Sequence, residues 1–240
     1  MTIAYDGTRY NGWQRQENTE QTIQGKLEQL ISRMTGETIE IQGSGRTDRG
    51  VHAHGQVANF HTDTRMTTEE MRTYMNEYLP MDIAILDVRD AAERFHSRLH
   101  VKRKTYCYHI WNSEVPNVFF RKYSYQIAEP LDLEAMKKAA ELLLGTHDFK
   151  SFCSKKKTKK STVRMIESIK ICKEGDEIVL TYKGNGFLYN MVRILTGTLI
   201  EVGHGEREPE EIPSIIKAQD REKAGFTAPA QGLFLERVDY

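Results

Sequence analysis

The regular alternation of strand-like and helix-like segments is the feature that most limits how this chain can fold. Apolar residues recur at helical spacing after Thr22 and again after Thr67, and Thr67 and Glu70 have the spacing of a capping box. Between these helices lie short stretches in which apolar and polar residues alternate, as in half-buried strands. The predicted strands cover residues 2–5, 38–42, 55–61 and 83–88. This order excludes an all-helical or all-β domain and predicts an α+β fold with helices on one face of a sheet.

A second unit of similar content is predicted to begin near Val101. Its first strand, residues 102–111, places Tyr106 and Tyr108 on one face. The other predicted elements are a helix over 131–144, a hairpin of strands 163–172 and 177–182, helices over 190–202 and 209–218, and a final strand over 232–240. We therefore expect two α+β domains, residues 1–100 and 101–240, as a structural duplication would produce.

The loop between the second and third predicted strands concentrates glycine and charge. Its sequence is GSGRTDRGVHA, residues 43–53. Glycine reaches positive φ without a Cβ penalty, so this backbone can turn sharply. Asp48 lies between Arg46 and Arg49, and neighbouring positive charge favours the ionised carboxylate. From these residues alone, a reactive carboxylate and a polar turn whose aspartate pairs with an arginine are equally good interpretations.

Composition excludes some partners and compartments. Lys plus Arg and Asp plus Glu both number 34, so the average charge predicts no partner. No apolar run approaches the ~20 residues of a membrane helix, and the first residues lack the basic-then-apolar order of a secretory signal. Cys107, Cys153 and Cys172 lie far apart, which argues against a disulfide framework and a zinc site. We expect a cytoplasmic protein without membrane contact.

Several chemistries lack their sequence signals. No GxSxG motif for a serine nucleophile and no GxxxxGK[ST] motif for a nucleotide occur. His52 and His54 could share one face of a strand, but no acidic or cysteine ligands accompany them in the sequence. We therefore expect no nucleotide cofactor, no other cofactor and no metal.

Aromatic and basic side chains interleave in residues 95–98 (FHSR) and 103–108 (RKTYCY), and lysines cluster at 155–157. Local basic clusters can bind phosphates even in a neutral protein. Unpaired RNA is bound by stacking bases on rings while cations hold phosphates. Core packing explains Phe95 or Tyr108 equally well, and a solvated loop explains the lysines. Core packing does not explain why so many cations border the rings, so the pattern favours RNA.

Taken together, these motifs resemble those of the TruA-type tRNA pseudouridine synthase family. The loop GSGRTDRGVHA is similar to the signature of that family, and further matching stretches follow in the same order along nearly the whole chain. They are YDGT and GWQ (residues 5–8 and 12–14), FHSR (95–98), RKTYCY (103–108), FLYNMVR (187–193), and GLFL with VDY (232–235 and 238–240).

The resemblance implies a fold, a reaction and partners. The implied fold has two ferredoxin-like or RRM-like α+β domains whose antiparallel sheets meet around a central basic cleft. The implied reaction, an isomerisation without cofactor, converts uridine to pseudouridine in the tRNA anticodon stem-loop, at tRNA positions 38–40. The implied assembly is a homodimer in which one tRNA touches both subunits.

The resemblance also implies roles for single residues. Asp48 corresponds to the catalytic carboxylate, which suits the reaction because breaking the glycosidic bond builds positive charge at the sugar. Arg193 would pair with Asp48, Arg46 would help to extrude the target nucleotide, and Tyr106 would lie against the flipped base. Whether Asp48 attacks the sugar, attacks the base or abstracts a proton stays open. The implied RNA contacts are Phe95, His96, Ser97, Arg98, Leu99, Lys155, Lys156 and Lys157.

Two alternatives stay open beside the tRNA enzyme. The same chemistry could act on another RNA such as ribosomal RNA, or the scaffold could serve a non-catalytic RNA-binding or chaperone protein. The joint presence of Asp48, Arg46, Tyr106 and Arg193 favours an enzyme. A protein that only binds RNA needs no carboxylate in a cleft that faces phosphates.

Overall fold

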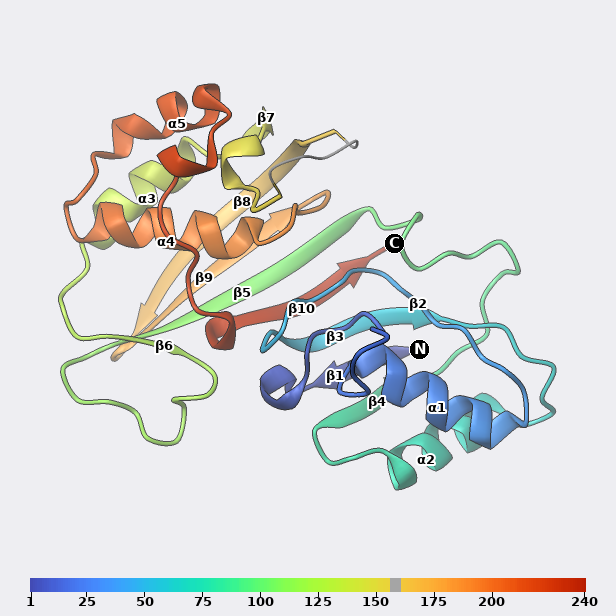
Figure 1. The fold of residues 1–240 in the computed structure, drawn as a ribbon. Helices are drawn as coiled ribbons and strands as arrows, with labels where there is room; N and C mark the ends of the chain where they lie inside the picture. The colour runs from blue at the N-terminus through green and yellow to red at the C-terminus, as the bar shows by residue number, and fades with distance from the viewer. Residues whose placement is uncertain (156–160) are drawn as a thin grey trace. The chain divides into compact units, whose positions relative to one another are not determined.

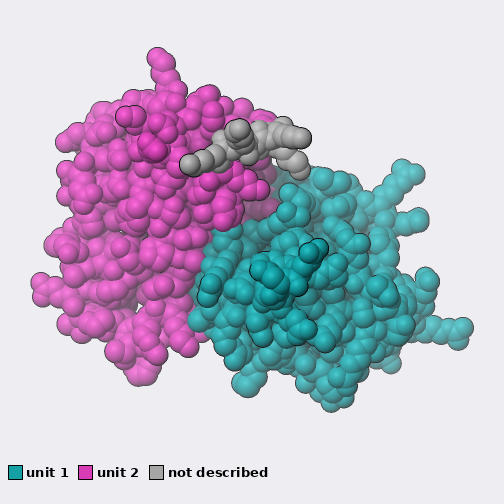
Figure 2. Space-filling model, in the orientation of Figure 1, with its two compact units in different colours: residues 1–102, 234–240 teal, residues 103–233 magenta. Residues whose placement is uncertain are grey.

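The chain forms two compact units in the computed structural model, which describes residues 1–155 and 161–240. Unit 1 contains residues 1–102 and 234–240, and unit 2 contains residues 103–233 (Figure 2). The last strand, β10 (Leu233–Asp239), therefore belongs almost entirely to unit 1.

Unit 1 is built on a sheet in which β3 lies between β1 and β10. Strand β1 pairs antiparallel with β3 and with β4, and the short β2 pairs antiparallel with β3. Strand β10 runs parallel to β3, with Phe234 opposite His52. The strands are β1 (Thr2–Tyr5), β2 (Gln42–Gly43), β3 (His52–Asn59) and β4 (Ile83–Asp87). The glycine-rich loop thus connects β2 to an inner strand of the sheet.

Two capped helices, α1 (Ile23–Thr35) and α2 (Thr68–Tyr78), accompany this sheet (Figure 1). The Thr22 side chain accepts a hydrogen bond from the Gly25 N–H at the start of α1, and α1 ends at Gly36 with φ of 77°. The predicted capping box of Thr67 and Glu70 is present at the start of α2. Both helices therefore form where their sequence signals predict.

Unit 2 is built on a longer antiparallel sheet. Strand β5 pairs antiparallel with β9, β9 with β8 and β8 with β7, while the short β6 runs parallel to β5. The strands are β5 (Arg103–Asn112), β6 (Tyr125–Ile127), β7 (Gly145–Asp148), β8 (Val163–Glu174) and β9 (Glu177–Gly184). Tyr106, Tyr108 and Ile110 are buried on one face of β5, as the alternation predicts.

Unit 2 also contains the helices α3 (Leu133–Glu141), α4 (Met191–Gly203) and α5 (Ile212–Ala218). Helix α4 is buried along most of its length, with Leu195 and Leu199 wholly enclosed. Its first turn carries Arg193, so a well-packed helix fixes the backbone of that residue.

The predicted strand over residues 38–42 forms only at its end, as β2. Ile39 and Ile41 are buried, as their alternation predicts. Their N–H groups, however, donate to Ser32 Oγ and Glu28 Oε1 of α1, both at 3.0 Å, instead of to a neighbouring strand. Side-chain acceptors on α1 replace the backbone acceptors of a neighbouring strand. The predicted burial of Ile39 and Ile41 is therefore confirmed, whereas the strand predicted for this segment is wrong.

Other differences lie at element ends. The helix predicted over 131–144 ends at Glu141, and β7 starts at Gly145, whose φ is 96°. The segment 209–218 splits into a short 3-10 turn, Pro209–Glu211, and α5. No sequence pattern predicts the short strands β6 and β7. Strand pairing within the two units is mixed but mostly antiparallel, which confirms the α+β class. Among residues 1–155 and 161–240, no helix is long and apolar enough to cross a membrane.

Candidate active site

The glycine-rich loop is anchored at its start by buried polar groups. Ser44 donates its N–H to the Val57 carbonyl at 2.8 Å and its hydroxyl to Gln56 Oε1 at 2.6 Å. Gln56 in turn donates from Nε2 to the Gly45 carbonyl at 3.0 Å. Both side chains are completely buried, so these bonds fix the loop to the middle of β3.

Thr47 anchors the centre of the loop. Its hydroxyl lies 2.8 Å from the hydroxyl of Tyr5 in β1, and its carbonyl accepts the Trp13 N–H at 3.0 Å. Burial raises the pKa of the Tyr5 hydroxyl well above its ordinary value, so this group is protonated and can donate or accept. Thr47 is itself buried, and the backbone on either side of it is held in place.

Glycine is required where a neighbouring segment crosses the loop. A Cβ on Gly12 would lie 2.7 Å from the Thr47 carbonyl oxygen, and Gly12 has φ of 93°. Gly50 closes a tight turn in which the Val51 N–H donates to the Asp48 carbonyl at 3.1 Å, and its φ is 77°. The GWQ motif therefore packs directly on the backbone that carries Asp48.

Asp48 and Arg46 flank the buried Thr47 and differ in exposure. Arg46 is exposed and Asp48 is half-buried. A carboxylate on a backbone anchored by Ser44, Gln56 and Thr47 keeps one position while staying within reach of a ligand. This arrangement suits a reactive group better than a surface turn, which would have no need of buried anchors.

The two histidines of β3 have separate surroundings. The His52 ring is buried, accepts the Gly7 N–H at Nδ1 over 3.1 Å and stacks on Phe234 with ring centres 4.6 Å apart. His54 is exposed, and its Nδ1 lies 2.7 Å from Glu236 Oε2. Within the described ranges, the fold brings together no three metal-ligating side chains of the His, Cys, Asp and Glu types.

Tyr106, predicted to lie against the flipped base, belongs to unit 2. Its ring is only 8% exposed and meets the edge of Phe187, with ring centres 5.2 Å apart and planes at 83°. Phe187 opens the FLYNMVR motif, which leads into α4. The fold thus brings two of the sequence motifs, RKTYCY and FLYNMVR, into direct contact.

The Arg193 side chain donates two hydrogen bonds to other described residues of unit 2. Its Nε donates to the Ala228 carbonyl at 2.6 Å, and its Nη1 donates to Asn190 Oδ1 at 3.1 Å. It lies in the first turn of α4, where the helix dipole disfavours a cation. A guanidinium has five N–H donors, and these two bonds use two of them. A cation at this unfavourable helix end is therefore suited to an anionic partner.

Asn190 orients the Arg193 side chain, a contact that no sequence motif predicts. It has left-handed backbone geometry, with φ of 60°, which is unusual for a residue other than glycine. Its Oδ1 accepts from Arg193, and its Nδ2 donates to Ser154 Oγ at 3.0 Å, so the side chain does not cap α4. An asparagine directly before a helix and three residues before an arginine is a weak signal in sequence alone.

The segment 95–99 mixes anchors with exposed side chains. Ser97 is buried, its hydroxyl donates to the Gln42 carbonyl, and its carbonyl accepts the Tyr240 hydroxyl at 2.6 Å. Phe95 is half-buried against Tyr240, with ring centres 5.0 Å apart. His96 is also half-buried, whereas Arg98 and Leu99 are exposed. The exposed pair is therefore the part of this segment best placed to contact a ligand, and the predicted RNA contacts stay predictions.

Only the first residue of the predicted lysine cluster falls within the described part of the chain. The Lys155 ammonium lies 5.8 Å from the centre of the Tyr189 ring. Lys156 and Lys157 lie outside the described residues.

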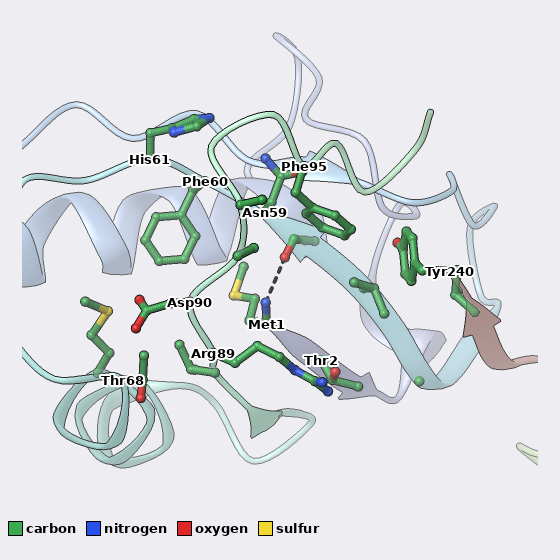
Figure 3. A pocket seen from close by; sticks show the side chains of 18 of the residues that line it. Met1, Thr2, Asn59, Phe60, His61, Thr68, Arg89, Asp90, Phe95 and Tyr240 are labelled. Carbon is green, nitrogen blue, oxygen red and sulfur yellow. Dashed lines mark hydrogen bonds between the residues drawn. The ribbon is translucent and has the colours of Figure 1, made fainter. Parts of the chain in front are cut away.

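A cavity of about 550 Å³ lies in unit 1, away from the glycine-rich loop. Its walls include Met1, Phe60, Phe95 and Tyr240, and within it the Met1 ammonium donates to the Ala58 carbonyl at 2.9 Å (Figure 3). None of residues 43–53 lines this cavity, so it contributes no wall around Asp48.

The four predicted catalytic residues divide between the units. Asp48 and Arg46 belong to unit 1, and Tyr106 and Arg193 belong to unit 2. The pairing of Arg193 with Asp48 and the stacking of a base on Tyr106 stay predictions.

Comparisons with known proteins agree on one family. A family model described as "tRNA pseudouridine synthase" matches residues 1–98 and 139–240. The chain is 48% identical over 240 residues to "tRNA pseudouridine synthase A 2" of a Bacillus cereus strain, and 50% identical over 240 residues to "tRNA pseudouridine synthase A" of a Bacillus species. Both matches cover 100% of this chain and 98% of the relative. A protein of the latter name from Brevibacillus brevis is 48% identical over 238 residues, covering 99% of this chain and 97% of the relative.

Proposed function

The chain belongs to the tRNA pseudouridine synthase family, and from that premise we propose that Asp48 is the catalytic carboxylate and that the substrate is the anticodon stem-loop of tRNA. The enzyme is an isomerase. In the reaction the bond from C1′ of the ribose to N1 of uracil breaks and a bond from C1′ to C5 forms. The proton on C5 is lost and N1 gains one, so no oxidant, reductant or cofactor is consumed.

The observation that carries the assignment of Asp48 is the anchoring of its backbone. Ser44, Gln56 and Thr47 hold the loop through buried hydrogen bonds, while the Asp48 side chain is half-buried. A fixed anion can stabilise or attack the positive charge that develops at C1′ when the glycosidic bond breaks. The exposed Arg46, two residues earlier, is suited to take the place of the extruded base.

Unit 2 supplies the other proposed roles. We propose that Arg193 pairs with Asp48 and keeps it ionised, and that the flipped uracil stacks on Tyr106. Support for Arg193 comes from its place at the helix end that disfavours a cation, and from the two bonds that orient its guanidinium. Support for Tyr106 comes from Phe187, which fixes one edge of its ring.

We propose a domain division into residues 1–100 and 101–240, each a ferredoxin-like module, around a central basic cleft. In unit 1 the elements that precede β10 follow the order strand, helix, two strands, helix, strand. Apart from β10, which also pairs with β3, the strands pair in the order β4-β1-β3-β2, that of a ferredoxin-like sheet. In unit 2 the elements β5, α3, β8, β9 and α4 reproduce the first five of these six types, with the short strands β6 and β7 added, and β10, the next strand in the chain, lies almost entirely in unit 1. A cytoplasmic location accords with a tRNA substrate.

Mapping pseudouridine in total RNA tests the substrate. RNA from cells with and without the gene would be compared by a chemical method that marks pseudouridine. We expect loss at uridines of the anticodon stem-loop, tRNA positions 38–40, and no change in ribosomal RNA. If pseudouridine is lost only from ribosomal RNA, the substrate is ribosomal RNA and not tRNA. If no RNA loses pseudouridine, a non-catalytic RNA-binding protein is favoured.

We also propose that the enzyme is a homodimer, and an exposed apolar loop supports this. Phe119 is 85% exposed and Phe120 is 56% exposed, and Val115 and Val118 on the same loop are also exposed. Asn117 Oδ1 accepts the N–H groups of Phe119 and Phe120 at 3.2 and 3.1 Å, so a local turn holds the backbone that carries both rings. Two neighbouring, exposed phenylalanines are typical of an interface, and each can bury roughly 150–250 Å².

The mass of the particle in solution tests the homodimer and this surface together. Phe119→Glu should convert a dimer to a monomer in light scattering, whereas Met81→Glu, at an exposed methionine of unit 1, should leave the dimer intact. A wild-type monomer would refute the dimer. A Phe119→Glu variant that stays dimeric but loses affinity for tRNA would assign the loop to RNA instead.

A further inference from the structure

Arg164, the second residue of β8, is a half-buried cation whose hydrogen-bond acceptors within the described ranges are carbonyl oxygens. Its Nη1 donates to the carbonyls of Ser161 and Val163 at 2.9 and 2.6 Å. No carboxylate of the described residues lies within ion-pair distance of it. Burial lowers the pKa of this guanidinium, as expected for a cation partly removed from water, and the nearby Cys153 acts in the opposite direction.

Two arginines of unit 2, Arg103 and Arg207, contrast with Arg164, whereas Arg193 and Arg221 also donate to carbonyl, amide or hydroxyl oxygens. Arg103 lies 2.7 Å from Glu167 Oε1, and Arg207 pairs with Glu201. Removing a cation from water is costly unless an anion compensates, so half-burial without a carboxylate points to an anion that arrives with a ligand. A guanidinium binds phosphate in a fixed geometry through paired N–H groups.

The surroundings of Arg164 connect it to Tyr106. The next residue, Met165, donates its N–H to Asn185 Oδ1 at 3.0 Å and accepts the Asn185 N–H at 3.1 Å. A Cβ on Gly186 would lie 3.7 Å from Arg164 Nε, so the guanidinium lies beside the turn that leads to Phe187. Phe187 touches the ring of Tyr106. One short segment therefore fixes Arg164 relative to the ring proposed to stack on the flipped base.

We propose that Arg164 binds a backbone phosphate of the substrate RNA, next to the nucleotide whose base stacks on Tyr106. The proposal rests on the proposed function, because it takes RNA as the ligand and Tyr106 as the stacking ring. It makes Arg164 a positioning residue, since it holds the strand and does not touch the reacting atoms. An extruded nucleotide needs such a hold on its phosphate because leaving the base stack costs a few kcal/mol.

Salt dependence distinguishes a phosphate contact from a structural role. One lost phosphate contact reduces the slope of log K against log salt concentration by about 0.7–1. A variant that is merely distorted loses affinity without that change of slope. Removing the contact is expected to raise both KM and the Kd for unmodified tRNA by about 10-fold, since such a contact holds substrate and transition state alike.

The experiment compares Arg164→Gln, Arg164→Lys and a control, Lys173→Gln. Lys173 is an exposed cation on the same strand, nine residues on and roughly 30 Å away at ~3.3 Å per residue. Kd over a salt series, kcat and KM would be measured for each full-length variant with unmodified tRNA. We expect Arg164→Gln to bind tRNA more weakly and with a smaller salt-dependence slope, while kcat changes less than about 3-fold. Arg164→Lys should recover part of the affinity and part of the slope, and Lys173→Gln should match wild type.

Either of two results would overturn the proposal: an Arg164→Gln variant with wild-type Kd and slope, or one that loses affinity at unchanged slope. Both are separable from failure of the proposed function. If Asp48→Asn still forms pseudouridine, the catalytic assignment fails whatever Arg164 does. If Asp48→Asn is inactive while Arg164→Gln binds tRNA normally, only the phosphate contact is refuted.

Discussion

Replacing Thr47 by valine should loosen the catalytic loop, because it removes a buried hydroxyl and keeps the shape of the side chain. Thr47 Oγ1 lies 2.8 Å from the hydroxyl of Tyr5, and both side chains are buried. Valine at this position leaves the Tyr5 hydroxyl without that partner in the interior. An unsatisfied buried hydroxyl costs ~1–3 kcal/mol.

A double-mutant cycle gives the magnitude of this one interaction. Thr47→Val should cost ~1–2 kcal/mol and Tyr5→Phe ~0.5–1.5 kcal/mol, whereas the double variant should cost less than their sum, since no orphaned hydroxyl remains. For a chain of this size, each kcal/mol corresponds to a shift of about 2–4 °C in Tm.

Urea unfolding followed by tryptophan fluorescence and by circular dichroism measures these free energies, with coincidence of the two curves as the test of two-state behaviour. Pseudouridine formation by the Thr47→Val variant should also fall, because Thr47 precedes Asp48. Additive single effects, within about 0.3–0.5 kcal/mol, would refute the coupling of Tyr5 to the loop. Thr47→Ser keeps the hydroxyl and serves as the control.

Substitutions at Tyr106, Asn190 and Gly12 test the units separately. Tyr106→Phe should retain more activity than Tyr106→Leu, since phenylalanine preserves stacking, and equal loss in an assay on unmodified tRNA would indicate a role for the hydroxyl instead. Asn190→Ala removes the bonds to Arg193 and Ser154, so kcat should fall by roughly 10-fold or more, for a loss of ~1.4 kcal/mol or more, and a wild-type kcat would exclude positioning by Asn190. Gly12→Ala places a Cβ 2.7 Å from the Thr47 carbonyl oxygen at a φ of 93°, so the protein should unfold at lower urea concentration. In the control, Gly36→Ala, the Cβ has open space around it, so only the φ of 77° should lower the stability.

Elements with local signals could be predicted from the sequence. The capping residues Thr22 and Thr67 and the final Gly36 fix the ends of α1 and α2, because each satisfies backbone groups within its own helix. The buried face of β5 follows from simple alternation. Elements that depend on distant partners could not be predicted, and β6 is one case: its three residues pair with β5 and carry no pattern of their own.

The candidate site divides in the same way. The motifs name Asp48, Arg46, Tyr106 and Arg193 as candidates, and their roles stay predictions. The groups that hold them could not, because Tyr5 and Thr47 are 42 residues apart and Asn190 and Ser154 are 36 apart in the sequence. Their hydrogen bonds exist only once the fold has brought the segments together. Arg164 belongs to this group, since the absence of a carboxylate partner among the described residues is a property of the folded chain.

Asp48→Asn tests the central claim most directly. The amide keeps the size of the side chain, and the Asp48 carbonyl that accepts the Val51 N–H is untouched, so fold and tRNA affinity should stay close to wild type. We expect pseudouridine formation under single-turnover conditions to fall at least ~10³-fold, about 4 kcal/mol in the barrier. Asp63→Asn, at an exposed aspartate of the same unit, should react at the wild-type rate. An Asp48→Asn variant that converts uridine as fast as wild type would contradict the account.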